Sequence, residues 1–418
     1  MKTENEDVQQ GGTITLNKMM KPIAEPFRMP VILLTVVVAG LSQGLLLPLL
    51  TILLEDAGVS SGINGFNAAG MYIGSFLAMF VVEKPIRRFG YKRVLIAGLL
   101  LDFFATLSFP FWTNIWVWFL LRFLVGIGNS SLHFSAQLWI LTSCPEHKKG
   151  SYISFYGMAY GIGFCIGPAG INLLQFGQWA PFAAVLSFYA GVLFLLLKLP
   201  EEKGASAEIQ KKEQSIQKRY TQTLRIAWFA LIPAFLYGFM EAVLNSNFAL
   251  YGLRIGLDES ALSLLLPVIG IGGLALQLPL GMLSDRIGRK KVLLAAGIIG
   301  GLCFLLVPLA GGNVWLIGLC LFVAGGLVGS FFSLGLAYAS DLLPKVLLPT
   351  ANVIASINHS LGSVAGPNLG GLSIQYISLS SLFWMLGGIY LIFAFAEIWF
   401  KGKKESVQQE VPSTHLSM

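Results

Sequence analysis

The stretch from Val31 to Leu54, VILLTVVVAGLSQGLLLPLLTILL, decides the fold. It runs for 24 residues without a charge, and a helix needs roughly 20 apolar residues to cross about 30 Å of hydrocarbon. Similar apolar blocks extend from Val94 to Phe111 and from Val292 to Ala310. None of them alternates apolar and polar residues, as the strands of an outer-membrane barrel do. We therefore expect an all-α integral membrane protein.

The composition of the whole chain points the same way. Of its 418 residues, 55% are hydrophobic and 12% are charged, whereas soluble proteins usually carry about 25% charged residues. We place twelve transmembrane helices at residues 30–54, 62–82, 92–111, 113–142, 150–175, 178–199, 225–252, 260–283, 291–311, 313–343, 349–375 and 379–400. The polar linker 200–224 divides them into an N-terminal bundle, 30–199, and a C-terminal bundle, 225–400. Residues 1–29 and 401–418 are expected to form tails.

The basic residues indicate how these helices are oriented. If both termini are cytoplasmic, 26 of the 28 Lys and Arg residues lie in the inner loops and tails, Arg254 lies in an outer loop and Arg122 lies within a span. Because Lys and Arg accumulate in cytoplasmic loops, we expect a multi-pass protein of the cell (cytoplasmic) membrane, both termini inside. No cleavable signal peptide is expected, since residues 1–28 are polar. Anionic lipid, and not nucleic acid, then explains the net charge of +7.

Enzyme and cofactor motifs are missing from the sequence. The four Cys and four His are scattered, so neither a metal site nor a disulfide framework is expected. No nucleophile with a base is evident, which argues against an enzyme. The ATP-binding motif G-x-x-x-x-G-K-[ST] does not occur either. We therefore expect no cofactor, and we expect an ion gradient or the substrate gradient to supply the energy.

An internal repeat relates the two halves of the chain. Gly90 matches Gly288 at an offset of 198 residues, and the offset is 199 further along the chain. The pairs at 199 are Pro145 with Pro344, Gly163 with Gly362, Gly167 with Gly366, and Pro168 with Pro367. One inserted residue reconciles the two offsets. Because each half has an even number of spans, the repeat is parallel.

Residues 281–291, GMLSDRIGRKK, are similar to the signature G-x-L-x-D-R-x-G-R-[KR]-[KR] of the major facilitator superfamily (MFS). With the repeat, the chain resembles a transporter of this family over residues 30–400, which implies the MFS fold, two six-helix bundles around a central site. The resemblance also implies an inner gating latch at Asp285, Arg286, Gly288, Arg289, Arg88 and Gly90. A positively charged loop without a gating role is the alternative. The first-half loop departs from the pattern, with Glu83 and Arg87 in place of the Gly and the Asp.

A glycine-rich element follows in spans five and eleven. Gly163, Gly167 and Pro168, like Gly362, Gly366 and Pro367, resemble the G-P element of the family's antiporters. Glycines spaced by four residues let helices approach closely, and proline bends them. The fuller form lies in span eleven, because span five has Ile171 and Asn172 where two glycines would complete it. The element thus suggests antiport, with helix packing alone as the alternative.

Polar side chains within the spans are candidates for a cavity. Arg122 begins an element R-x-x-x-G-x-G, and a charge at this depth costs at least about 2.5 kcal/mol on insertion scales. On a helix, Arg122, Asn129, His133 and Gln137 share one face. Tyr237, Glu241 and Asn245 share another, and His359 and Gln43 add to the lining. An interhelical hydrogen-bond seam, or packing in the case of the two His, is the alternative.

Glu241 is the candidate for proton coupling. Hydrocarbon disfavours the charged form of a carboxyl group, so that such a group can take up and release protons near neutral pH. Our hypothesis is that Glu241 carries the coupling proton or binds a cationic group, with Arg122 as the opposing fixed charge. A static ion pair is the alternative.

These features predict a secondary active transporter that moves a small organic molecule by alternating access. Proton antiport with efflux of amphipathic or drug-like compounds is the favoured version. Import of a sugar or metabolite by proton symport, and a non-transporting membrane sensor, are the alternatives. The expected partners are the substrate, protons and the lipid bilayer, and the chain is expected to act as a monomer.

Overall fold

A computed structural model describes residues 27–143, 149–200 and 216–399. These residues form helices and no strand, which confirms the all-α expectation. The helices are α2 (Arg28–Asp56), α3 (Ser61–Val81), α4 (Glu83–Phe89), α5 (Tyr91–Ser108), η2 (Phe109–Phe111), α6 (Ile115–Ser143), α7 (Lys149–Ile166), η4 (Gly167–Phe176), α8 (Ala180–Leu197), α9 (Ile216–Arg254), α10 (Glu259–Ile287), α11 (Arg289–Leu306), η5 (Val307–Ala310), α12 (Val314–Val328), α13 (Phe331–Leu342), η6 (Lys345–Leu347), α14 (Leu348–Tyr376) and α15 (Ser381–Trp399). The expected tails lie outside the described residues, apart from 27–29, and so do residues 201–215 of the expected linker.

Most of the expected spans pass a test of length and apolar composition. Within the described residues, nine helices are long and apolar enough to cross a membrane, and the count reaches ten if α3 and α4, bent by 53°, are taken as one span. A shorter apolar helix lies at Ser381–Ala396. Helix α14 does not pass, because Asn and Ser residues lower its hydropathy. The twelve spans and their division into two bundles therefore stay a prediction.

The two chain halves, residues 27–199 and 216–399, differ where their helices break. Helix α7 ends at Ile166 and continues as the 3₁₀ helix η4, with Pro168 at its start, whereas α14 runs through Pro367 as an α-helix. Proline removes a backbone donor and crowds the preceding turn, so a change of helix type at Pro168 is the physical consequence.

Helix α9 also differs from the expected span. It begins at Ile216, within the stretch predicted as linker, and bends at Ala227, where φ is −123° and ψ is 17°. The segment before Ala227 contains Lys218, Arg219 and Arg225, which accounts for its assignment to the linker.

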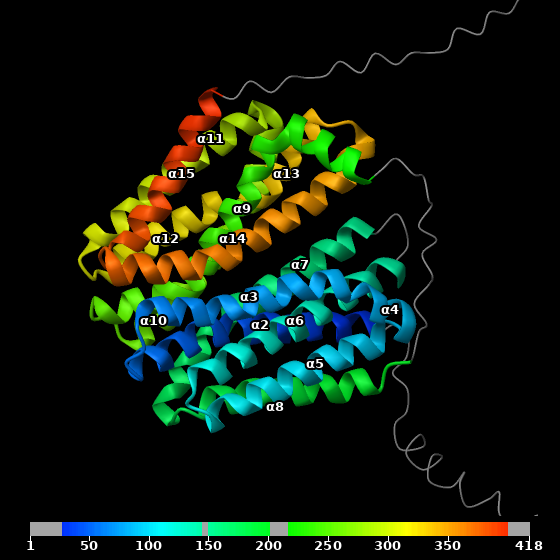
Figure 1. Cartoon of the computed structure of the whole chain (residues 1–418), viewed down its shortest axis with the longest axis vertical. Helices are drawn as coiled ribbons and strands as arrows, with labels where there is room; N and C mark the ends of the chain where they lie inside the picture. Colours follow the sequence, from blue (N-terminus) through cyan, green and yellow to red (C-terminus); the bar gives the residue numbers. More distant parts are fainter. Residues whose placement is uncertain (1–26, 144–148, 201–215, 400–418) are drawn as a thin grey trace, which may run out of the picture.

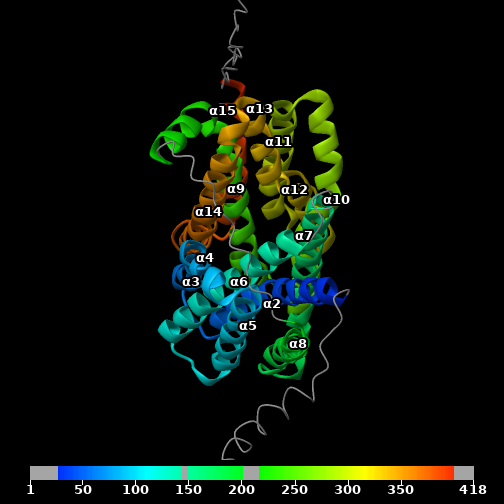
Figure 2. The ribbon, with the colours of Figure 1, turned by 90° about the vertical axis from the view of Figure 1, so that its right-hand side faces the viewer.

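Figure 1 shows α2 to α8 in the lower part of the molecule and α9 with α11 to α15 in the upper part. Figure 2 shows α10 reaching down beside α7. The closest pairings within each half are α2 with α7, α3 with α6, and α9 with α14. Between the halves, α3 contacts α14, α2 contacts α9, and α10 contacts α7 and η4.

Glycines allow the closest of these approaches. A Cβ atom at Gly163 of α7 or at Gly167 of η4 would overlap the carbonyl oxygen of Val37 or Leu41, respectively, in α2. In the second half, Gly362 and Gly366 of α14 lie in the same way against Phe235 and Phe239 of α9. Without a hydrophobic driving force between helices in lipid, such backbone contact is a main source of helix association.

The chain halves meet at one end of the molecule, called here the closed end. Arg254 Nε and Nη2 lie 2.8 and 3.2 Å from the two carboxylate oxygens of Glu55. The backbone N–H of Gly62 donates to Gln375 Oε1 (2.9 Å), and Asn172 Nδ2 donates to Ser263 Oγ (2.9 Å).

Close backbone packing accompanies these polar contacts. A Cβ at Gly65 of α3 would overlap the carbonyl oxygen of Pro367 in α14, and one at Gly371 would overlap that of Ser61. The ribbons of the two halves separate toward the opposite end, called here the open end, which carries α4 (Figure 1). Gly90 follows α4, and Gly288 lies at the equivalent turn between α10 and α11. At Gly157 of α7 and Gly281 of α10, on the open-end side, an added Cβ would meet nothing within 4 Å.

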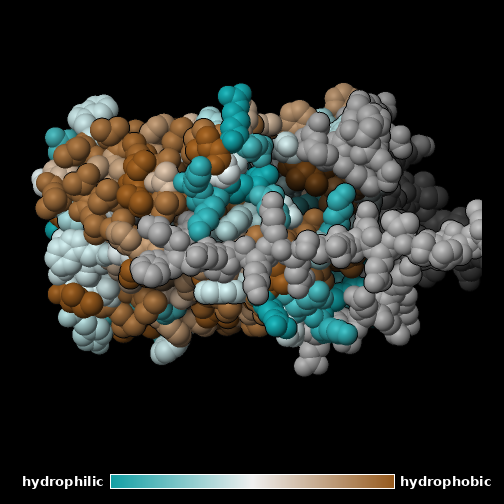
Figure 3. Space-filling view, turned by 90° about the horizontal axis from the view of Figure 1, so that it is seen from above, coloured by the Kyte–Doolittle hydropathy of each residue, from teal (hydrophilic) through white to brown (hydrophobic). Residues whose placement is uncertain are grey.

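The outer surface is apolar. Trp315, for example, is 88% exposed, and Leu278 and Leu309 are also largely exposed. Figure 3 shows one face of the molecule as mostly brown, with hydrophilic residues gathered toward the open end. Lipid is the solvent that such a surface requires.

Replacement of Gly65 by Ala tests whether the closed end depends on backbone contact. We expect Gly65→Ala to destabilise the protein by about 1 to 3 kcal/mol, because the added methyl group has no space. The matched control is Gly157→Ala, which should be neutral or stabilising by up to about 1 kcal/mol, since alanine is the better helix former. Thermal melting of the two purified variants in detergent measures the difference. Equal melting temperatures would contradict the contact.

Candidate functional site

In the first half, Gln43 of α2 links two other helices. Its Oε1 atom accepts hydrogen bonds from Asn129 Nδ2 of α6 and from the Tyr160 hydroxyl of α7, both at 3.1 Å. Asn129 is buried, and its Oδ1 atom has no hydrogen-bond partner among the described residues. The three side chains form a neutral polar cluster that faces the second half.

His133 extends this cluster along α6. Its Nδ1 atom lies 2.8 Å from the Tyr156 hydroxyl, and its ring meets that of Tyr160 edge-on, with centroids 4.9 Å apart. Gln137 lies half-buried one turn farther along the helix. Of the four polar residues predicted to share this face, Asn129 and His133 thus join one cluster with Gln43.

In the second half, Glu241 of α9 and His359 of α14 form a pair. Glu241 Oε2 lies 3.1 Å from His359 Nε2, which donates this hydrogen bond when it carries a proton. The two side chains keep 21% and 30% of their surface exposed although both lie in the middle of long helices. The Tyr237 ring lies 5.5 Å from that of His359, and Asn245 Nδ2 donates to the Glu241 carbonyl at 2.7 Å.

The two clusters occupy equivalent positions in the repeat. Gln43 and Glu241 are 198 residues apart, and Tyr160 and His359 are 199 apart, which are the two offsets of the framework residues. The repeat also relates the rings that pack on these pairs. His133 meets the Tyr160 ring edge-on, and Phe332, 199 residues after His133, meets the His359 ring edge-on with centroids 5.8 Å apart. The first half therefore holds a neutral pair where the second half holds an ionisable one.

Groups from both halves surround Glu241. Tyr72 of α3 lies within electrostatic range of Glu241 and Arg122, and Tyr160 lies within range of Glu241 and Tyr237. Tyr72 is thus close enough to feel the charges of both Glu241 and Arg122. The direct partner of Glu241 is His359, in its own half.

Arg122 stands apart from these clusters. Its side chain is 2% exposed, and its three guanidinium nitrogens have no hydrogen-bond partner in the part of the chain that the structure describes. Asp102 of α5 is equally buried, but its carboxylate lies against Gly128, on another face of α6.

The expected gating residues lie at the open end. Gly90 and Gly288 both have positive φ, 86° and 97°, and each precedes a helix, α5 or α11, so a side chain at either would strain the backbone. Arg289 pairs with Asp285 (2.8 Å) and with Asp341 at the end of α13 (3.1 Å). This network ties the loop after α10 to α13.

The corresponding first-half loop is held differently. Glu83 pairs with Arg87 at 2.6 Å, and both side chains are exposed. Arg88 lies over the Phe89 ring at 5.2 Å, and Lys92 donates to carbonyl oxygens at the end of α8. Arg286, in the second-half loop, is exposed to solvent. The charge network described for Arg289 has no counterpart among these contacts.

Sequence reasoning missed Tyr72, Tyr156, Tyr160 and Phe332 as members of the site. For Tyr160 and Phe332 a signal was available, since each lies 199 residues from a histidine that was selected. Tyr72 carried no such signal, because its place depends on how α3 meets α9.

Comparisons with known proteins agree on one family. The model of the Major Facilitator Superfamily matches residues 32–274 and 230–416. The chain is 38% identical over 364 residues to the uncharacterized MFS-type transporter YfkF of Bacillus subtilis, covering 86% of this chain and 92% of that protein. It is 25% identical over 405 residues to Multidrug resistance protein 2 of the same organism, with 91% and 98% covered.

A solved structure supports the fold. The nucleoside transporter NupG aligns with a TM-score of 0.74 over 89% of this chain and 98% of its own, at 15% sequence identity. The family resemblance expected from the loop signature and the repeat is confirmed.

Removal of the Gln43 side-chain oxygen, the acceptor shared by Asn129 and Tyr160, should destabilise the protein. Gln43→Leu leaves the Asn129 and Tyr160 donors without an acceptor, and we expect a destabilisation of about 1 to 3 kcal/mol. Tyr160→Phe, which removes one donor and leaves the acceptor in place, should cost less. Combining the two should cost less than their sum, because they share one interaction. Additive changes in detergent melting experiments would show that the hydrogen bond is not formed.

Proposed function

Because the chain belongs to the major facilitator superfamily, we propose that it is a proton-coupled secondary transporter that moves a small organic molecule by alternating access. The observation that carries the proposal is the pair of Glu241 and His359, an ionisable pair in the second half with Tyr72 and Tyr160 of the first half within electrostatic range of Glu241. In this proposal, a proton binds to the pair in one state of the cycle and leaves it in the other.

The position of the pair supports a coupling role. A carboxyl group and an imidazole at hydrogen-bond distance can share one proton, and partial exposure gives water access to it. The first-half equivalents, Gln43 and Tyr160, carry no charge near neutral pH. Proton coupling is therefore assigned to the second half, and the first half supplies neutral hydrogen-bonding groups.

The closed and open ends support alternating access. The hydrogen bonds and the ion pair that join the halves lie at the closed end. If both termini are cytoplasmic, as the Lys and Arg distribution favours, this arrangement would correspond to an inward-open state. The cycle would bring the open ends of α7 and α10 together and part the closed end.

For direction, we propose export of amphipathic compounds from the cell by proton antiport. The support is the likeness to Multidrug resistance protein 2, a relative at 25% identity. A sensitivity screen of a deletion strain against chemically diverse toxic compounds tests this direction. Growth failure on one carbon source would instead indicate an importer, and no flux of any compound in proteoliposomes would indicate a sensor.

Glu241→Gln tests the coupling role. With the compound found by the screen, the variant should lose pH-driven accumulation in proteoliposomes by at least about tenfold, because the amide cannot carry the proton. Exchange of substrate across the same membrane without a pH gradient should persist. His359→Gln should lose part of the pH-driven component.

The matched control is Asp102→Asn, which replaces the other wholly intramembrane carboxyl group by its amide. Since Asp102 lies against Gly128 of α6, in the first half, and takes no part in the Glu241–His359 pair, we expect this variant to retain pH-driven accumulation. Normal pH-driven accumulation by Glu241→Gln at wild-type protein levels would refute the proposed coupling site.

A further inference from the structure

Arg122 is a buried cation without a partner. It lies in α6, two turns from Asn129, and exposes 2% of its side chain. A guanidinium group has five N–H donors, and within the described residues none of its three nitrogens finds an acceptor. A charged group without hydrogen-bond partners is strongly unfavourable in a low-dielectric interior. Arg122 therefore needs an anionic or hydrogen-bond-accepting group from elsewhere.

The surrounding residues do not supply such a group. Tyr72 of α3 faces Arg122, but a tyrosine is neutral near neutral pH. The Glu241 carboxylate is hydrogen-bonded to His359. The Asp102 carboxylate lies against Gly128, on another face of α6. Among the described residues, no anionic side chain is hydrogen-bonded to Arg122.

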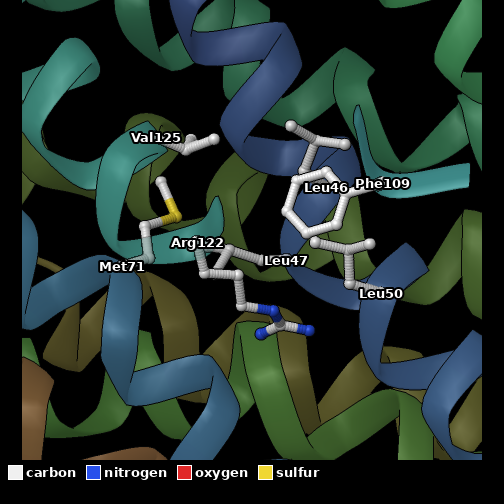
Figure 4. A pocket seen from close by; sticks show the side chains of 7 residues that line it. All are labelled: Leu46, Leu47, Leu50, Met71, Phe109, Arg122 and Val125. Atoms are coloured by element: carbon white, nitrogen blue, oxygen red, sulfur yellow. The ribbon is translucent and has the colours of Figure 1, made fainter. Parts of the chain in front are cut away.

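The walls next to Arg122 are apolar. Arg122 borders a small pocket lined by Leu46, Leu47 and Leu50 of α2, Met71 of α3, Phe109 of η2 and Val125 of α6. Figure 4 shows these side chains around the base of Arg122, with the guanidinium group pointing beyond them, away from Val125. A ligand group that meets the guanidinium would therefore have hydrocarbon side chains beside it.

We propose that Arg122 binds the anionic group of the transported molecule, and that the substrate is an amphipathic organic monoanion, with a carboxylate as its charged group. This inference rests on the proposed function and names its substrate class. A carboxylate matches the guanidinium fork with two parallel hydrogen bonds. One unpaired cation neutralises one negative charge, whereas a dianion would leave an excess charge in the same low-dielectric space.

The charge of Arg122 also disfavours cationic compounds. A lipophilic cation would bring a second positive charge close to Arg122, and like charges repel strongly where water is scarce. The pocket beside Arg122 has a volume of about 10 Å³, room for about one water molecule, so the body of the substrate would lie outside it.

The test uses the full-length protein in detergent and three probes of one shape: 4-phenylbutyrate, its amide 4-phenylbutyramide, and the amine 4-phenylbutylamine. Binding is measured by ligand-induced shifts in thermal melting near pH 7, with ionic strength matched by chloride. We expect the carboxylate to bind at least about tenfold more tightly than the amide, and the amine most weakly. Arg122→Gln should reduce the carboxylate preference to within about twofold.

Two further variants keep the test decisive. Arg122→Lys retains the charge but not the planar fork, so an intermediate preference is expected even if Arg122→Gln folds poorly. Arg254→Gln removes a cation at the closed end, outside the pocket, and should leave the carboxylate preference unchanged. Equal binding of the three probes, tighter binding of the amine, or no binding of any probe up to about 10 mM would overturn the proposal.

Transport assays separate this inference from the proposed function. Carboxylate-selective binding that depends on Arg122, without flux in proteoliposomes, would support the anion site and refute transport. Flux of a cationic or neutral compound, without carboxylate selectivity, would refute the anion site and leave the transport function in place.

Discussion

Direct contact between helix backbones is the constraint on which the site depends. Gly40 of α2 lies against the carbonyl of Tyr160, and Gly238 of α9 lies against the carbonyl of His359. Three residues on from each glycine, on the same helix face, stand Gln43 and Glu241. The glycines therefore fix the separation at which each side-chain pair hydrogen-bonds. A larger residue at either glycine would force the helices apart and the pair with them.

Much of this arrangement could be predicted from the sequence, because lipid imposes simple requirements on a chain. Apolar length predicts the helices, and the repeat offsets predict that Gly90 and Gly288 serve the same turn, where both indeed have positive φ. The effect of proline was not predictable. Pro168 and Pro367 are equivalent in the repeat, yet only Pro168 opens a 3₁₀ helix, whereas α14 continues through Pro367.

The sequence predicts which residues belong to the candidate site, but not which of them hydrogen-bond to one another. Glu241, His359, Gln43, Asn129 and His133 are polar residues within apolar spans, a strong signal in any membrane protein. Their partners depend on contacts between helices more than 80 residues apart in the chain, such as Gln43 with Asn129. The role of Arg122 as the fixed charge opposing Glu241 stays a prediction, and nothing in the sequence indicates that Tyr72 lies within electrostatic range of both residues.

The ion pair of Glu55 and Arg254 makes the closed end sensitive to the medium on its own side of the membrane. Both side chains retain solvent contact, and dissolved ions screen such pairs over about 10 Å at 0.1 M salt. An exposed pair of this kind contributes up to about 1 kcal/mol, roughly a fivefold change in the ratio of two states. Because the pair spans both chain halves, it is lost when that end opens. In the proposed transport cycle, the balance between states with this end closed and open would thus shift with the salt concentration on that side of the membrane, even where substrate and pH stay constant.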